Sequence, residues 1–195
     1  MATLQGMSGT DVRAEVAELS ALLPLWIGKI YQYDTASFGF RLNGEEKARH
    51  FLYAEKGVRA HLTSELPPAP KNPSGFSMYL RKYIEGGKVL SIEQKGIERV
   101  IIFSIGKGPN EYKLIFELFD EGNLIFTDKD FKIINALSQK RFRERDIVAG
   151  AFYDGTAKSP EELSYEEFCE KIRGTDSDIV RALATVFMLG GVNAE

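Results

Sequence analysis

The sequence predicts an α+β domain in which antiparallel strands are flanked by helices. Three observations support this class. Amphipathic helical segments occur near the start, middle and end of the chain, and many short β-like runs lie between them, separated by turn residues. Regular strand–helix–strand alternation is missing, which argues against a doubly wound parallel sheet. With 195 residues, 44% of them hydrophobic, the chain can bury one ordinary core.

The first predicted helix starts at Ser8. Asp11 follows three residues later, the spacing of a capping box. One face of the helix is apolar, with Val12, Val16, Leu19 and Leu23. Pro24 ends the helix because proline cannot continue the hydrogen-bond pattern.

Short strands rich in aromatic and β-branched residues come next. We predict them at 27–33, 38–42, 49–54 and 59–63. A proline-rich connection over 67–73 is stiff and extended. A second helix is predicted over 74–85, because Phe76, Leu80, Tyr83 and Ile84 share one face. Gly86 and Gly87 end it.

A β-meander is predicted after the second helix, with strands at 88–94, 98–105, 111–119, 124–127 and 131–136. Glycine, aspartate and asparagine supply the turns between them. The runs 100–103 and 114–116 are continuously apolar, so we expect those strands to be covered on both faces.

The chain changes character after Gly150. Ser164 begins a predicted helix, and Leu163 and Phe168 have hydrophobic-staple spacing. Another helix is predicted over 178–189. We expect residues 1–6 to be a cloning remnant with Met7 as the natural start, 7–153 to form the β-rich domain, 154–174 a helical connection, and 175–195 the truncated start of a further domain.

Composition excludes several classes of protein. Cys169 is the single cysteine, so neither an intramolecular disulfide nor a cysteine-rich zinc module can form. The chain has no apolar run of membrane-helix length and begins with no secretory signal, so we expect no membrane partner. These features predict a reducing, cytoplasmic location.

Charge is distributed unevenly. Residues 1–153 carry 21 Lys or Arg and 19 Asp or Glu, a net +2, whereas 154–195 carry 4 and 9, a net −5. Basic side chains form two groups, one of Lys140, Arg141, Arg143 and Arg145, and one of Lys71, Arg81, Lys82, Lys88, Lys95 and Arg99. Basic residues interleaved with aromatics suit phosphate contact and base stacking. Composition alone, however, favours the simpler interpretation that these residues form a solvated charged surface that covers a packed core.

No catalytic motif is visible. The phosphate-binding and dinucleotide loops are missing, and the run 106–110 is typical of a hairpin turn. His50 and His61 lie in separate β-like segments without metal-ligand spacing, and Cys169 has acidic neighbours that disfavour a thiolate nucleophile. We therefore expect no catalytic residue, no metal, no cofactor and no small-molecule substrate.

Several segments in register resemble the N-terminal domain of the NFACT family. They are 11–16, 59–63, 67–86, the motif Ile92-x-Gln94-x-Gly96-x-Glu98-Arg99, and 121–128, and the resemblance covers about residues 7–190. The family includes the eukaryotic nuclear export mediator factor, the yeast tail-adding subunit of the ribosome quality control complex, and bacterial and archaeal proteins called fibronectin-binding protein A.

The resemblance implies a β-sandwich-like fold similar to the N-terminal domain of the Fpg/Nei DNA glycosylases, followed by a helix-hairpin-helix-type domain. It also implies binding to the large ribosomal subunit with stalled peptidyl-tRNA, and recruitment of tRNA for template-free C-terminal tailing. Because the ribosome performs the peptide transfer, the resemblance implies an RNA-binding translation factor that is not itself an enzyme.

The family's functional residues map onto two places in this chain. An aspartate in the first helix matches Asp11, two residues before Arg13, and an Asp-Arg pair matches Glu98-Arg99. Glutamate for aspartate is a departure that keeps the charge but moves the carboxylate one methylene outward. The predicted tRNA- or ribosome-binding residues are therefore Asp11, Arg13, Glu98 and Arg99, with basic RNA contacts at Arg81, Lys82, Lys140, Arg141, Arg143 and Arg145.

Two other functions stay open. One is a nucleic-acid-binding relative of the Fpg/Nei proteins without glycosylase activity, because the N-terminal Pro-Glu of those enzymes is missing here. The other is a surface adhesin that binds fibronectin, against which the missing secretory signal argues.

Overall fold

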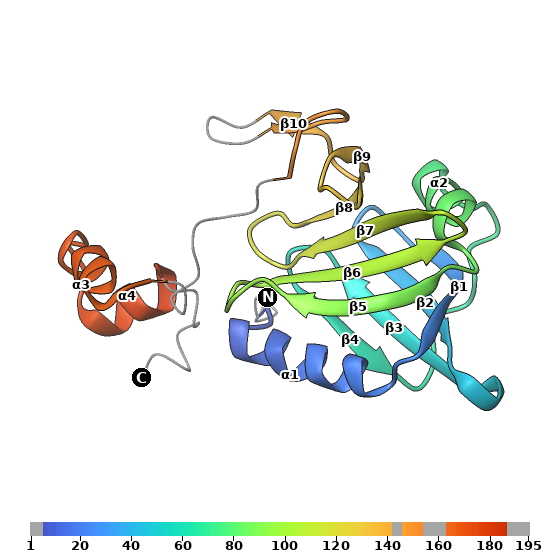
Figure 1. Cartoon of the computed structure of the whole chain (residues 1–195), viewed down its shortest axis with the longest axis horizontal. Coiled ribbons are helices and arrows are strands. Elements are labelled where there is room, and N and C mark those ends of the chain that lie inside the picture. Colours follow the sequence, from blue (N-terminus) through green and yellow to red (C-terminus); the bar gives the residue numbers. More distant parts are fainter. Residues whose placement is uncertain (1–5, 142–145, 154–162, 187–195) are drawn as a thin grey trace.

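A single antiparallel sheet forms the body of the protein. The computed structural model describes residues 6–141, 146–153 and 163–186. The sheet has nine strands in the order β4-β3-β2-β1-β5-β6-β7-β8-β9. Their bounds are β1 Leu25–Gln32, β2 Ser37–Asn43, β3 Arg49–Glu55, β4 Arg59–Thr63, β5 Lys88–Gln94, β6 Val100–Lys107, β7 Asn110–Glu117, β8 Asn123–Asp128 and β9 Ile133–Ala136. The predicted α+β class is confirmed (Figure 1).

The helices begin where capping residues predict. In α1, Gly9–Ala21, Ser8 and Asp11 form the expected capping box, and Ser164 and Glu167 do the same for α3, Tyr165–Arg173. Ser74 caps α2, Gly75–Ile84, and α4 spans Ile179–Thr185. The predicted end of the last helix, 187–189, lies outside the described residues. None of the described helices is long and apolar enough to cross a membrane.

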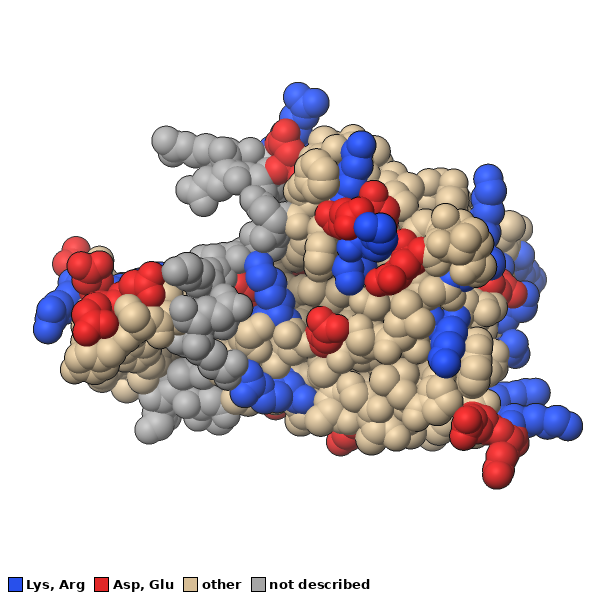
Figure 2. All heavy atoms as spheres, viewed as in Figure 1, with Lys and Arg blue, Asp and Glu red and all other residues tan. Residues whose placement is uncertain are grey.

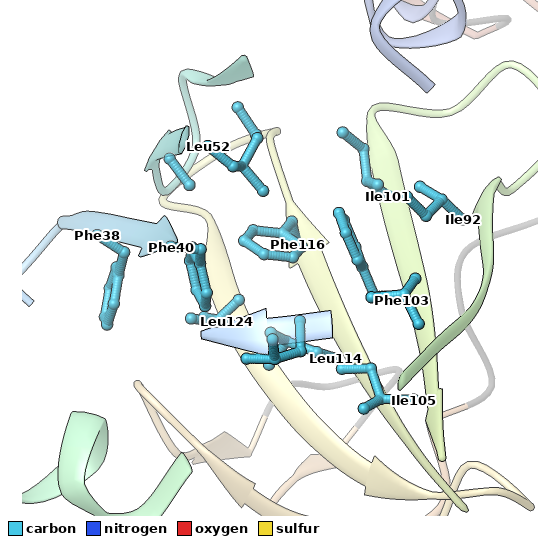
Figure 3. Close-up of a cluster of buried hydrophobic side chains, with 14 of the residues drawn as sticks. Phe38, Phe40, Leu52, Ile92, Ile101, Phe103, Ile105, Leu114, Phe116 and Leu124 are labelled. Atoms are coloured by element: carbon cyan, nitrogen blue, oxygen red, sulfur yellow. The ribbon is translucent and has the colours of Figure 1, made fainter. Parts of the chain in front are cut away.

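The sheet curls until its two halves face each other. Phe40 on β2 and Phe116 on β7 are separated by β1, β5 and β6, which in a flat sheet would place them about 19 Å apart. Their ring centroids instead lie 5.4 Å apart, edge to face (Figure 3). The expected sandwich-like packing is confirmed, and one continuous sheet forms both layers.

The two halves of the sheet are joined by a short pairing between β1 and β5. These strands pair through Leu25–Val89 and Trp26–Lys88, and the register of β1 shifts between Ile27 and Ile30. Helix α2 contributes Leu80 and Ile84 to the main core, both fully buried. The open side of the curl is therefore closed by a helix.

A smaller core covers the other face of β6–β8. Val100, Ile102, Ile115 and Ile125 point into it and pack with Ile147 and Tyr153. The continuously apolar runs on β6 and β7 are thus covered on both faces, as predicted.

Some boundaries differ from the prediction. Strand β6 begins at Val100, because Glu98 lies in a turn where its N–H donates to the carbonyl of Lys95 at 3.0 Å. Strand β9 begins at Ile133, because Phe131 has a φ of 65°, which breaks an extended conformation.

A short two-stranded ladder, which the sequence pattern did not predict, follows the sheet. Two of the basic residues that follow the last predicted strand form β10, Lys140–Arg141. This strand pairs with β11, Asp146–Ile147. Two-residue strands are too short for a periodic signal. Arg143 and Arg145 lie outside the described residues.

Helix α1 covers the edge strand β4. The N–H of Leu62 donates to Glu15 Oε1 at 2.7 Å, and the N–H of Ala60 faces Met7 Sδ at 3.3 Å. An uncovered strand edge would invite pairing with another chain. Glu15 is buried at 8% exposure, although the sequence pattern gave it no role.

Candidate functional site

Separate turns meet at one end of the sheet, which we call the turn end. It comprises residues 7–13, 56–58, 95–99 and 120–122. One main-chain hydrogen bond joins two of these segments, Met7 N to Val58 O at 2.8 Å, and two more tie them to the end of β7 and the residue after it, Gly57 N to Glu117 O at 3.1 Å and Leu118 N to Arg99 O at 2.8 Å. The turn end is therefore a fixed surface built from segments far apart in the sequence.

Two glycines allow this close assembly. A Cβ on Gly9 would overlap the carbonyl oxygen of Ile97, so the first turn of α1 rests directly on the β5–β6 turn. A Cβ on Gly122 would overlap the nitrogen of Gly57, and both residues have positive φ, 63° and 73°.

Gln94 connects α1 with the β5–β6 turn. Its Nε2 donates to the carbonyl of Gly9 at 2.7 Å and to the carbonyl of Glu98 at 2.9 Å. Arg13 Nε donates to Gln94 Oε1 at 3.4 Å, and Arg13 Nη2 donates to the carbonyl of Gly96 at 3.2 Å. One amide thus links the segment that carries Asp11 and Arg13 with the segment that carries Glu98 and Arg99.

Asp11 is exposed and caps its own helix. Its Oδ2 accepts from the N–H and from the hydroxyl of Ser8, each at 2.7 Å. A carboxylate in the first turn also interacts favourably with the helix dipole. This structural role holds Asp11 at the surface, where its second oxygen can face a ligand.

Glu98 and Arg99 differ in exposure. The side chain of Glu98 is 5% exposed, whereas Arg99 is half-buried. Burial lowers the pKa of Arg99, and nearby Asp120 acts in the opposite direction. Arginine stays charged despite such shifts. The structure therefore offers Arg99, more than Glu98, for direct contact with a charged ligand.

Further charges surround the β7–β8 turn. Lys140 forms an ion pair with Glu121, and this contact lowers the pKa of Glu121, with Lys56 adding a smaller effect. Lys140, predicted as an RNA contact, is thus brought to the turn end. Cations and carboxylates alternate here, and each carboxylate offsets part of the attraction for an anion.

The other predicted basic residues lie elsewhere. Arg81 Nε donates to the carbonyl of Ile30 at 2.7 Å, and Lys107 Nζ donates to the carbonyl of Lys82 at 3.2 Å. Lys107 ends β6, whereas Arg99 precedes its start, so the two groups lie at opposite ends of that strand. Arg141 is exposed in β10. Figure 2 shows basic and acidic side chains scattered over the face in view.

The two histidines stand on separate strands. His50 lies on β3 and His61 on β4, and they are not cross-strand partners. Among the residues that the structure describes, no group of three or more His, Cys, Asp or Glu side chains is placed to hold a metal ion.

Sequence reasoning missed the roles of Gln94, Gly57 and Glu121. Gln94 and Gly96 stand in the motif 92–99, and Glu121 and Gly122 in the motif 121–128, both of which carry the family resemblance. Those motifs were the available signal, but the role of each residue depends on contacts between distant turns.

The fold and the turn end define a β-rich domain in which Asp11, Arg13, Glu98 and Arg99 lie where its turns meet. A family model described as "NFACT N-terminal and middle domains" matches residues 8–195. The chain belongs to this family.

Relatives extend the comparison across kingdoms. The chain is 36% identical over 137 residues to mouse "Ribosome quality control complex subunit NEMF", covering 70% of this chain and 12% of the relative. It is 34% identical over 142 residues to "Archaeal Rqc2 homolog aRqcH" of Methanocaldococcus jannaschii, 69% of this chain and 21% of the relative. The match to "Rqc2 homolog RqcH" of Bacillus subtilis, 30% identical over 165 residues, covers 79% and 27%. The chain therefore spans less than a third of each of these relatives.

Solved structures share the fold. The N-terminal part of the fibronectin/fibrinogen-binding protein of Streptococcus suis superposes with a TM-score of 0.79 at 28% identity, covering 97% of this chain and 77% of that one. The N-terminal domain of fibronectin-binding protein PavA of Streptococcus pneumoniae gives 0.77 at 24% identity, covering 97% and 81%.

Proposed function

We propose that this domain is a tRNA- and ribosome-binding module of a cytoplasmic ribosome quality control factor. It binds the large ribosomal subunit carrying stalled peptidyl-tRNA and helps to recruit tRNA for template-free tailing of the stalled chain. Membership of the NFACT family and the names of its relatives support this proposal.

The observation that carries the proposal is the meeting of Asp11, Arg13, Glu98 and Arg99 at the turn end. The sequence separates the two pairs by more than eighty residues, yet Gln94 contacts both segments. A surface that joins arginine with a helix N-terminus suits contact with RNA phosphates or base edges.

Each residue has a distinct role in this proposal. Arg99 grips a phosphate or a guanine edge, since a guanidinium can bind either in a bidentate manner. Arg13 adds positive charge beside it, and Asp11 presents the capped start of α1. Glu98, buried in the turn, acts on the position of Arg99 and not on RNA directly.

The proposed role is binding without catalysis. Peptide transfer on the ribosome requires no group from this domain, so its contribution is to hold RNA in place. Lys140 and Arg141 extend the positive surface from the turn end along β10.

Binding of tRNA to this protein across a salt series tests the proposal. We expect the affinity to fall with rising salt, and Arg99→Ala to weaken binding and reduce the slope of log K against log salt by about one. Lys129→Ala is the matched control, because it removes one exposed cation from the β8–β9 turn, at the far end of β8 from Asn123.

Asp11→Asn serves as a second variant. Asparagine keeps an oxygen that can accept from Ser8, so α1 stays capped while the charge is removed. The proposal is contradicted if both variants bind tRNA, and co-sediment with large subunits when placed in the full-length factor, as well as the native sequence does.

A second candidate function is binding to fibronectin or fibrinogen, which the name of the similar Streptococcus suis protein favours. Immobilised fibronectin and fibrinogen should then retain this domain at micromolar concentration. Retention that survives Arg99→Ala, together with no measurable tRNA binding, would favour the adhesin over the quality control factor.

A further inference from the structure

The outer face of β1–β4 carries a row of aromatic side chains. Cross-strand pairs place Tyr31 beside Gly39, Gly39 beside Tyr53, and Tyr53 beside His61. The neighbours of these positions on β2 and β3, including Phe38, Phe40, Leu52 and Ala54, point into the main core. Because side chains alternate along a strand, the row points away from that core.

Tyr33 completes the row. Gly39 has no side chain, and the hydroxyl of Tyr33 is buried there, 2.6 Å from where a Cβ on Gly39 would stand, with Leu66 packed against the same position. The ring of Tyr33 is nearly parallel to those of Tyr31 and Tyr53, with centroids 6.3 and 6.4 Å away and interplanar angles of 24° and 22°. His61 continues the row at 6.0 Å from Tyr53.

Arginines flank the row at both ends. The guanidinium carbon of Arg81 lies 5.5 Å from the centroid of Tyr31, and that of Arg59 lies 5.5 Å from the centroid of Tyr53. Arg41 and Arg49 stand on the same outer face of the neighbouring strands, since they alternate with the core residues Phe40, Leu42 and Leu52. Glu55 is paired with Arg59, and two further carboxylates, Asp34 and Glu65, stand next to Tyr33 and Leu66 in the sequence.

A hollow at the end of β3 and β4 is lined from both faces of these strands, because His50 and Leu62 alternate toward the core side whereas Arg49, Phe51 and Thr63 lie on the outer face. It has a volume of about 340 Å³ and is lined by Leu22, Arg49, His50, Phe51, Leu62 and Thr63. That volume lies within the range of small-ligand sites, and the lining combines an apolar floor with cationic and hydroxyl groups.

We propose that the outer face of β1–β4 binds an unpaired RNA segment by stacking bases against the tyrosine row while Arg59 and Arg81 contact its phosphates. Aromatic rings between cations suit single-stranded nucleic acid because every base has a π-face, whereas paired bases are hidden in a stack. The positive charge of the arginines matches a polyanion and disfavours a basic partner. The choice of RNA over DNA rests on the proposed function. The surface adjoins the turn end, because Arg59 directly follows Val58, but Tyr31, Tyr33 and Tyr53 lie outside the turn-end segments.

A short single-stranded RNA, such as a ten-nucleotide uridine oligomer, is the direct probe, titrated against the whole chain by fluorescence anisotropy. Trp26 provides an intrinsic signal, because it is the single tryptophan of the chain and alternates with the core residues Leu25 and Ile27 on β1. We expect saturable binding, a change in Trp26 emission, and weaker binding of a duplex RNA of equal length.

Three variants separate stacking from charge. Tyr53→Leu should weaken binding of the oligomer by about tenfold, since it removes a stacking ring, and Tyr53→Phe should stay within about twofold. Arg59→Gln should weaken binding and reduce its salt dependence. Thermal melting checks that each variant is folded. If Tyr53→Leu does not fold, the affinity of Arg59→Gln for the oligomer tests the proposal instead.

Two variants distinguish RNA binding at the β1–β4 surface from RNA binding at the turn end. Arg99→Ala should leave binding of the short oligomer unchanged while it weakens tRNA binding, and Tyr53→Leu should affect the oligomer more strongly. The inference is overturned if the oligomer does not bind, if duplex RNA binds equally well, or if folded Tyr53→Leu and Arg59→Gln bind the oligomer as the native chain does.

Discussion

The side-chain amide of Gln94 donates to the main-chain carbonyl of Gly9 across 2.7 Å, so the last residue of β5 holds the first residue of α1. The same nitrogen donates to the carbonyl of Glu98. One side chain therefore couples the start of a helix to a turn more than eighty residues away, and the candidate site depends on that link.

Gln94→Ala should both destabilise the fold and weaken RNA binding. The change leaves two main-chain carbonyls and Arg13 without this partner, which costs about 1–3 kcal/mol in the free energy of unfolding. Chemical denaturation measures the loss. Gln139→Ala, which removes an exposed glutamine bonded to Asn135, is the control and should change stability by less than about 0.5 kcal/mol.

Gly9→Ala should displace α1 from the β5–β6 turn. The added methyl overlaps the carbonyl oxygen of Ile97, and such overpacking costs about 1–3 kcal/mol. Gly75→Ala is the matched change at the first residue of α2, where a Cβ meets nothing within 4 Å, and it should be neutral or stabilising. Equal melting temperatures for the two variants would contradict the close approach at Gly9.

Glu15→Gln should raise stability at neutral pH and lose that advantage in acid. Burial raises the pKa of Glu15 above its ordinary value of 4.5, although the hydrogen bond from Leu62 lowers it. Because burial disfavours the charged carboxylate, the native state holds its proton at higher pH than the unfolded state does. Stability therefore falls as pH rises from the unfolded pKa to the folded pKa.

Glutamine keeps an oxygen for the N–H of Leu62 but carries no charge. The gain at pH 7 should stay below about 1 kcal/mol, since the hydrogen bond from Leu62 offsets part of the cost of burying the charge. It should vanish below about pH 4.5, the unfolded value, where native Glu15 is also neutral. Urea denaturation at several pH values checks this, and a gain that is independent of pH would argue against a buried charge.

Glu121→Gln should strengthen RNA binding. Glu121 pairs with Lys140 at the turn end, so its removal leaves Lys140 available to a phosphate. The slope of log K against log salt should steepen by up to about one. Asp130→Asn, which releases Lys129 from a similar exposed pair on the β8–β9 turn, is the control and should leave tRNA affinity unchanged.

Phe40→Ala should loosen the two layers of the curled sheet. Phe40 is 1% exposed and meets Phe116 from the opposite layer, so we expect a loss of about 3–5 kcal/mol. Phe152→Ala removes a ring that is 65% exposed and should cost less than about 0.5 kcal/mol. Thermal unfolding of both variants provides the comparison.

Local elements were predictable because their signals are local. The capping boxes at Ser8 and Ser164 are confirmed, and strands β4 and β5 have the bounds that alternation and turn residues predicted. Phe131 shows the limit of that pattern, since an aromatic residue next to a strand occupies a turn with positive φ. The sandwich-like packing was expected only through the family resemblance, because no local pattern around Phe40 or Phe116 predicts that these two residues meet.

The candidate site was predictable in part. Asp11, Arg13, Glu98 and Arg99 were identified through a family resemblance, and the structure brings both pairs to one surface. It also separates them from Arg81 and Lys82, which the sequence grouped only by charge. The roles of Gln94, Glu15 and Glu121 came from contacts with residues on other elements.

The sequence by itself determined which segments are helical or extended, which faces are apolar, and the family to which the chain belongs. The helical and extended segments and their apolar faces follow from periodicity, capping and turn chemistry, which act over a few residues, whereas the family follows from several motifs in register. The tertiary structure decided which turns meet at the turn end, which glutamates are buried, and that Tyr31, Tyr33 and Tyr53 form one row. These depend on the register between strands and the curl of the sheet, which arise from packing between residues far apart in the chain.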